Sequence, residues 1–205
     1  MNDYEKYPIC DTDIWVNLCL GEIEDRLFEK YGKVFFVDVV KNEILRWKNG
    51  GYSYISTKLE DKIRNGSAII IEVEQMENID KKIIEKQLKE DAGFPSGFNT
   101  PKNKQKNMGE YMSAIIANHL GILLMKSNDH LFNEGEKGRE LYPDLIIKNW
   151  NATVVDLIEL NKRDSVLRKV RERNKNMSIS KDHYENGQAS LTDILKLKER
   201  FNNNF

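Results

Sequence analysis

Cysteine and histidine are scarce in this chain of 205 residues, which contains two cysteines and three histidines. Cys10 and Cys19 lie in apolar runs and form no C-x-x-C pair. We therefore expect buried thiols in a reducing compartment rather than a disulfide framework. The histidines have no spacing typical of zinc ligands, and His119 sits in a helical pattern that favours a structural role.

Long hydrophobic runs and net charge are also lacking. No apolar segment approaches the roughly 18 residues that cross a membrane. Residues 1–6 are polar and have no apolar segment of the kind that directs export. We therefore expect a cytoplasmic protein without a membrane partner. Because the formal net charge is −1, a nucleic-acid partner would have to be bound by a local basic patch.

Phosphate-binding G-x-x-x-x-G-K and nucleophilic G-x-S-x-G motifs are absent, as are internal repeats. The chain is 40% apolar, which is enough for one domain with a core. Strand-like apolar runs cover residues 7–10, 33–38, 67–74, 122–127 and 144–149. Helical patterns cover residues 14–31, 39–47, 53–65, 79–91 and 109–120. This alternation predicts an α/β fold, a three-layer α/β/α sandwich with a mainly parallel sheet of about five strands.

Four carboxylates stand where expected strands end or expected helices begin: Asp11, Glu43, Glu110 and Asp129. Asp11 and Asp129 directly follow strand patterns, and ligands of parallel sheets collect at the carboxyl ends of strands. Each acid alone favours a structural interpretation, as a helix cap or as a charge at a helix start. Together they indicate a site for Mg²⁺ or Mn²⁺, because clustered carboxylates need a cation or a proton to relieve their repulsion.

The order of these acids and their apolar context resembles the PIN domain, the nuclease fold of VapC-type toxins and of several RNA-processing enzymes. The resemblance covers roughly residues 7–160. Its most specific part is the helix pattern that starts at Gly109 and Glu110 and ends at Gly121, followed by a strand and the S-x-D at Ser127 to Asp129.

The resemblance implies that Asp11, Glu43, Glu110 and Asp129 are catalytic and bind Mg²⁺ or Mn²⁺. Three further residues would support them: Asp13, Ser127 and Asn128. The implied activity is metal-dependent endoribonuclease cleavage of RNA, with DNA also open as a substrate. A toxin role would add an antitoxin or another protein partner, and a homodimer is a further arrangement to test.

We expect the PIN-like domain to span residues 1–173. Residues 174–205 would form a polar linker and a C-terminal helical extension, in which Ser190 begins a short amphipathic helix. Residues 91–107 form a long, exposed loop by their turn-forming composition. Its Lys102, Lys104 and Lys106 are candidates for binding nucleic-acid phosphates, and the basic stretch 162–175 would extend that track. The alternative for both is an ordinary solvated surface.

Two other functions compete with a nuclease. A catalytically inactive PIN-fold module would bind a partner without cleaving it, although inactive members typically lose the acids kept here. A haloacid-dehalogenase-like phosphatase would use Asp11 as nucleophile and Asp13 as acid and base. Against the phosphatase, Ile14 and Trp15 replace the usual glycine and threonine after D-x-D, and a paired acidic motif is lacking.

Overall fold

The computed structural model describes residues 3–49, 51–101 and 106–177. Five strands form one sheet in the order β3-β2-β1-β4-β5, and all four neighbouring pairs are parallel. The strands are β1 (Ile9–Cys10), β2 (Val34–Val37), β3 (Ala68–Ile71), β4 (Leu124–Lys126) and β5 (Ile146–Lys148). The prediction of an α/β fold with a parallel, five-stranded sheet is confirmed.

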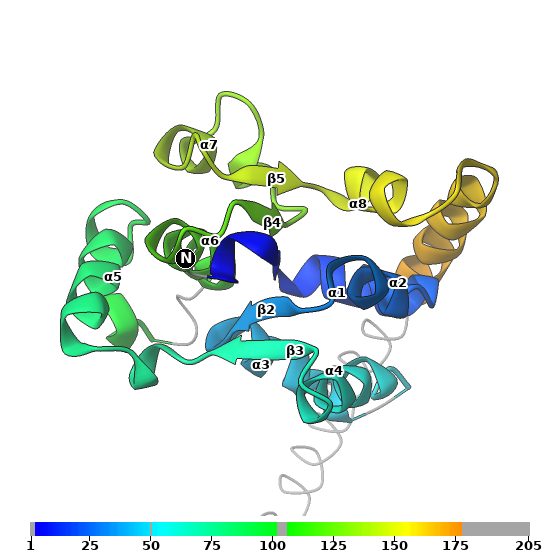
Figure 1. The fold of residues 1–205 in the computed structure, drawn as a ribbon, viewed down its shortest axis with the longest axis horizontal. Coiled ribbons are helices and arrows are strands. Elements are labelled where there is room, and N and C mark those ends of the chain that lie inside the picture. Colours follow the sequence, from blue (N-terminus) through cyan, green and yellow to red (C-terminus); the bar gives the residue numbers. More distant parts are fainter. Residues whose placement is uncertain (1–2, 50, 102–105, 178–205) are drawn as a thin grey trace, which may run out of the picture.

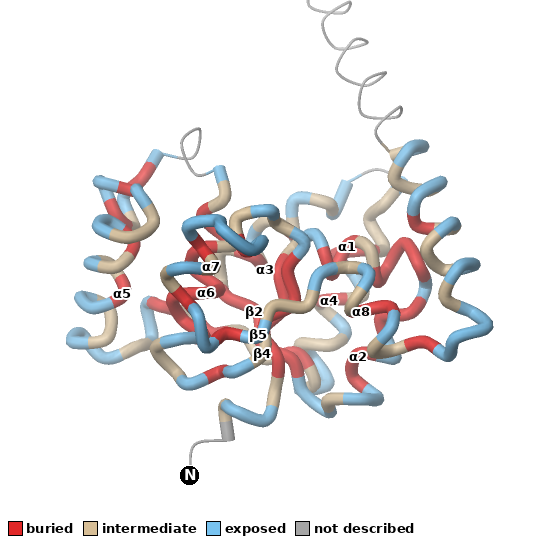
Figure 2. Tube along the Cα trace, turned by 90° about the horizontal axis from the view of Figure 1, so that it is seen from above, coloured by how far each residue is buried: buried red, intermediate tan, exposed pale blue. Residues whose placement is uncertain are grey.

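Helices connect the strands and cover both faces of the sheet, as a chain of parallel strands requires. They are α1 (Thr12–Gly21), α2 (Glu24–Tyr31), α3 (Asp38–Leu45), α4 (Tyr54–Arg64), α5 (Asn78–Glu90), α6 (Met108–Leu120), α7 (Lys137–Leu141), α8 (Trp150–Leu157) and a helix over residues 160–177. In Figure 2 the strands lie between α5, α6 and α7 on one side and α1, α2, α4 and α8 on the other. The predicted three layers are present.

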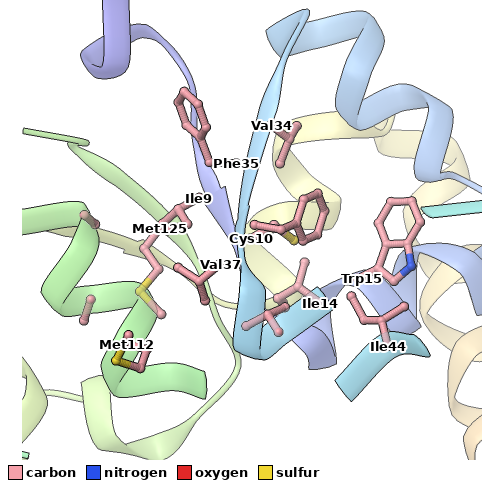
Figure 3. Packing of buried hydrophobic residues seen from close by; sticks show 14 of the residues in the cluster. Ile9, Cys10, Ile14, Trp15, Val34, Phe35, Val37, Ile44, Met112 and Met125 are labelled. Atoms are coloured by element: carbon pink, nitrogen blue, oxygen red, sulfur yellow. The ribbon is translucent and has the colours of Figure 1, made fainter. Parts of the chain in front are cut away.

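The core fills both faces of the sheet. All four residues of β2 are buried, which is typical of a strand covered on both sides. Figure 3 shows Met112 of α6 with Met125 and Val37 on one side of the strands, and Trp15 with Ile14 on the other. The Trp15 ring meets Phe36 edge-on at 5.6 Å, and its indole N–H donates to the Ile55 carbonyl at 3.1 Å. These contacts fix α1 and α4 against the sheet.

The chain changes direction across the sheet between β1 and β4. From β1 it proceeds outward to β2 and β3, and the next strand, β4, pairs with the opposite side of β1. Such a reversal leaves a crevice at the carboxyl ends of the two central strands, because the following helices diverge onto opposite faces. The crevice is the expected position of a ligand, and Asp11 follows β1 there while Ser127 follows β4.

The segment 91–107, predicted as an exposed loop, is buried in part. Phe94 is buried and its ring lies 6.1 Å from that of Tyr111 on α6, and Thr100 is also buried. The turn-forming residues around Phe94 predicted exposure, but burial of the Phe94 ring removes apolar surface from water and is favourable. Residues 102–105 lie outside the described residues.

The C-terminal boundary expected at residue 173 falls inside the 160–177 helix. The predicted amphipathic helix from Ser190 lies outside the described residues. Among the helices of the described part, none is both long and apolar enough to span a bilayer.

Candidate functional site

Asp11 joins β1 to α1 at the carboxyl end of β1. Its extended backbone caps α1, and its Oδ1 accepts a hydrogen bond from the Thr12 amide at 2.7 Å. Only 1% of the residue is exposed. Its Oδ2 accepts from the Ser127 hydroxyl at 3.0 Å, a contact that crosses from β1 to β4. The prediction of Asp11 at a strand end and of Ser127 beside the acids is therefore matched by direct contact.

Asp129 lies two residues beyond Ser127 in the same turn. Its backbone amide donates to the Ser127 hydroxyl at 3.3 Å, and its Oδ1 accepts from the Leu131 amide at 2.8 Å. His130 Nδ1 is 3.3 Å from the same Oδ1. Asn128, predicted to support the last acid, accepts from the Trp150 amide at 3.3 Å and ties the turn to α8.

Glu43 reaches the site from the second turn of α3. Its Oε2 accepts a hydrogen bond of 2.6 Å from the Thr12 hydroxyl, across 31 residues of sequence. Gly109, at the start of α6, leaves room for the same carboxylate: a Cβ on Gly109 would lie 3.2 Å from Glu43 Oε2. Thr12 and Gly109 position Glu43, and sequence reasoning assigned neither of them this role. Thr12 is part of the quoted "DTD" pattern and Gly109 precedes Glu110, but their contacts with Glu43 depend on the fold.

Glu110 occupies the first turn of α6 and interacts electrostatically with the other acids. Burial raises its pKa to about 7, against a hydrogen bond from its own backbone, and the charges of Glu43, Asp129 and Asp13 add to the rise. Burial likewise raises the pKa of Asp11, and the charge of Glu110 raises it further. The pKa of Asp13 is raised by burial and then by Asp129. The structure therefore brings the other three predicted acids, and Asp13, within electrostatic reach of Glu110.

No lysine or arginine among the described residues pairs with Asp11, Asp13, Glu43 or Glu110. A cluster of carboxylates without cationic partners suits a divalent cation, whose preferred ligands are carboxylate oxygens. Within the described ranges, however, no three acidic, histidine or cysteine side chains are gathered closely enough to hold an ion. Thr12 and the Leu131 amide hold two of the carboxylates in their present orientations. The donor chemistry fits Mg²⁺ or Mn²⁺, and binding requires these side chains to turn toward one another.

The predicted basic residues are only partly placed. Lys106 is exposed, four residues before Glu110, while Lys102 and Lys104 lie outside the described residues. In the stretch 162–175 several cations have structural tasks. Arg163 donates to the carbonyls of Val155 and Ile158 at the end of α8, at 2.9 and 2.8 Å.

A buried ion-pair network supports β4 on the face away from α6. Lys126 is fully buried, and its Nζ is 3.2 Å from Asp156 Oδ2 on α8. Asp156 also accepts from Lys30, Tyr31 and Lys148. Burial opposes ionisation of Asp156, but these hydrogen bonds and the charge of Lys126 hold its pKa well below its ordinary value. The network fixes the strand that carries Ser127.

No family model matches the sequence, and no curated protein does. Among solved structures, the chain is similar to a chain of VapBC2 from Rickettsia felis bound to a DNA fragment from their promoter. The identity is 16%, the match covers 70% of this chain and 98% of the other, and the TM-score is 0.41. A likeness of this size assigns no function, and any activity has to be inferred from the residues of the crevice.

Proposed function

We propose that the chain is a metal-dependent nuclease of the PIN type that hydrolyses RNA phosphodiester bonds. The observation that supports it most directly is Asp11 at the end of β1, bonded to Ser127 at the end of β4, with Glu110 near enough to Asp11, Glu43 and Asp129 for their charges to interact. Buried or half-buried acids that raise each other's pKa are costly to stability and are typical of functional sites.

The residues that would hold Mg²⁺ or Mn²⁺ are Asp11, Glu110 and Asp129, with Glu43 beside them. When bound, such an ion activates a water for attack on phosphorus and neutralises charge on the phosphate and the leaving oxygen. Ser127 keeps Asp11 oriented through its hydroxyl, and Thr12 keeps Glu43 oriented in the same way. Neither needs to titrate, so both would position the carboxylates over a wide range of pH.

The test is cleavage of a single-stranded RNA by the purified full chain, with Mn²⁺, with Mg²⁺ and with EDTA. Asp11→Asn and Glu110→Gln should each abolish cleavage, since removing one charge weakens both the cation site and the electrostatic stabilisation it supplies. Asp80→Asn is the matched control: Asp80 is an acid of α5 that contacts His119 at 3.1 Å. Its cleavage should match that of the unaltered protein.

Cleavage that persists in both variants, or in EDTA, would contradict the proposal. Release of phosphate from small monoesters, without RNA cleavage, would favour the phosphatase that uses Asp11 and Asp13. RNA binding with no hydrolysis under any metal would favour the inactive binding module. An antitoxin or another protein partner, and a homodimer, remain proposals that copurification and the measured solution mass would test.

A further inference from the structure

A groove of about 530 Å³ lies at the far end of α1 from the acidic site. It is bordered by the end of α1, by α4 with the turn before it, and by the 160–177 helix, which lies beside α1 in Figure 1. Its lining residues are Glu22, Tyr52, Tyr54, Lys58 and Arg173.

The 160–177 helix forms one wall because it packs antiparallel against α1. Later residues of this helix contact earlier residues of α1. A Cβ on Gly21 would lie 3.2 Å from Val170, Arg173 donates to the Leu20 carbonyl at 2.7 Å, and Asn174 donates to Asn17 at 2.9 Å. The wall therefore continues from the groove toward the end of α1 that carries Asp11.

Two tyrosine rings form the opposite wall. Tyr52 and Tyr54 are half-buried, and their ring centroids are 6.3 Å apart. Trp47 packs edge-on against Tyr52 at 6.4 Å and holds that ring in place. Flat aromatic faces held at the border of a groove can stack with nucleic-acid bases of any sequence.

Cations accompany the tyrosines. Arg173 and Lys169 both pair with Glu22, at 2.7 and 2.5 Å, which leaves this trio with one net positive charge. Lys58 lies 5.9 Å from the centre of the Tyr54 ring and pairs with Glu24. The groove thus combines aromatic faces with cations at its edge.

The composition of the lining distinguishes between classes of partner. An amphipathic protein helix binds a hydrophobic groove through its apolar face, whereas three of the five lining residues here are charged: Glu22, Lys58 and Arg173. Stacking faces and cations instead match bases and phosphates. The separation also suits a nucleic-acid strand, because Asp11 and Glu22 are eleven residues apart, or about 16 Å at the rise of an α-helix.

We propose that this groove binds the bases of single-stranded RNA a few nucleotides away from the bond positioned at the acidic site. The inference rests on the proposed nuclease function for the identity of the polymer. Tyr52 and Tyr54 stack with the bases, and the cations of Lys58 and Arg173 approach the phosphates.

The test measures RNA binding without cleavage. The full chain carrying Asp11→Asn, in EDTA, is titrated into fluorescein-labelled single-stranded RNA of ten or two nucleotides, and anisotropy gives Kd. Tyr52→Leu and Tyr54→Leu should each weaken binding of the longer RNA by about 5- to 100-fold, the effect of losing one stacked base. The short RNA, which cannot span from site to groove, should bind all variants alike.

Tyr7→Leu is the matched control, a half-buried tyrosine that packs on Phe35 at 6.0 Å, outside the lining of the groove. Urea unfolding confirms that each variant is folded. If one of the two groove variants does not fold, the other alone tests the inference. Equal affinity of control and groove variants for the longer RNA would overturn the inference, even where metal-dependent cleavage stands. Conversely, groove-dependent binding without cleavage by the unaltered protein would refute the nuclease and retain the groove.

Discussion

Glu110→Gln should stabilise the metal-free protein above pH 7 while it removes activity. The raised pKa of Glu110 means that the folded state holds its proton more tightly than the unfolded state does. Below the ordinary pKa of 4.5 the carboxyl is protonated in both states and contributes nothing. Between pH 4.5 and about 7 only the unfolded state ionises, so stability falls as pH rises, and above about 7 the loss is complete.

The magnitude follows from the two pKa values. A carboxyl pKa raised from 4.5 to about 7 corresponds to a loss of at most about 3.5 kcal/mol, since each pKa unit is worth about 1.4 kcal/mol. The glutamine side chain keeps the shape of the acid and cannot ionise. Relative to the unaltered protein, the variant should therefore gain up to about 3.5 kcal/mol of unfolding free energy between pH 4.5 and pH 8.

Urea unfolding in EDTA at several pH values between 4.5 and 8 measures this difference. Glu134→Gln, at an exposed position, is the control and should shift stability by less than about 0.5 kcal/mol at every pH. A Glu110→Gln difference that does not change with pH would refute the electrostatic reasoning. Adding Mn²⁺ should stabilise the unaltered protein by about 2.7 kcal/mol at 100 times Kd and the variant by less.

Three further predictions test the packing around the acids. Gly109→Ala should lower the kcat of RNA cleavage, because the added methyl group crowds the carboxylate of Glu43. Urea unfolding should show little loss of stability, because alanine favours a helix more than glycine does. Ser127→Ala removes the buried hydroxyl that donates to the aspartate after β1, and should cost about 1–3 kcal/mol in urea unfolding. Asp156→Asn should cost about 3–5 kcal/mol, since Lys126 stays buried without its carboxylate; a cost below 1 kcal/mol would show that the network is unimportant.

Local patterns in the sequence predicted the parts of the fold that local physics determines. The run Val34–Val37 is apolar throughout because both faces of β2 are covered, and that pattern identifies a central parallel strand without any structure. The same logic placed Asp11 at a strand end. The short β1 and β4 were recovered for the same reason, although the predicted runs extended one or two residues too far at some ends, since strand ends carry no signal of their own.

Contacts between distant residues could not be predicted in this way. The hydrogen bond from Thr12 to Glu43 depends on how α1 and α3 meet, and neither helix reveals it alone. The role of the basic stretch 162–175 also depends on contacts between distant residues. Its charge count indicated a phosphate track, but Arg163 caps α8, and Lys169 and Arg173 share one acid, Glu22, which leaves a single net positive charge beside the groove. A run of charges reports composition, whereas its task depends on the surfaces that the fold brings beside it.

Glu22 illustrates how such distant contacts overrule local preference. It ends α1 with a left-handed backbone, φ 57°, which favours glycine, and it places a negative charge where the helix dipole disfavours one. Lys169 and Arg173 compensate for the unfavourable charge, and their hydrogen bonds lower the pKa of Glu22 to about 2. The two ion pairs join the end of α1 to the 160–177 helix. The 160–177 helix also forms a wall of the groove that Tyr52 and Tyr54 line. Glu22, although locally unfavourable, therefore contributes to the surface that we propose binds RNA.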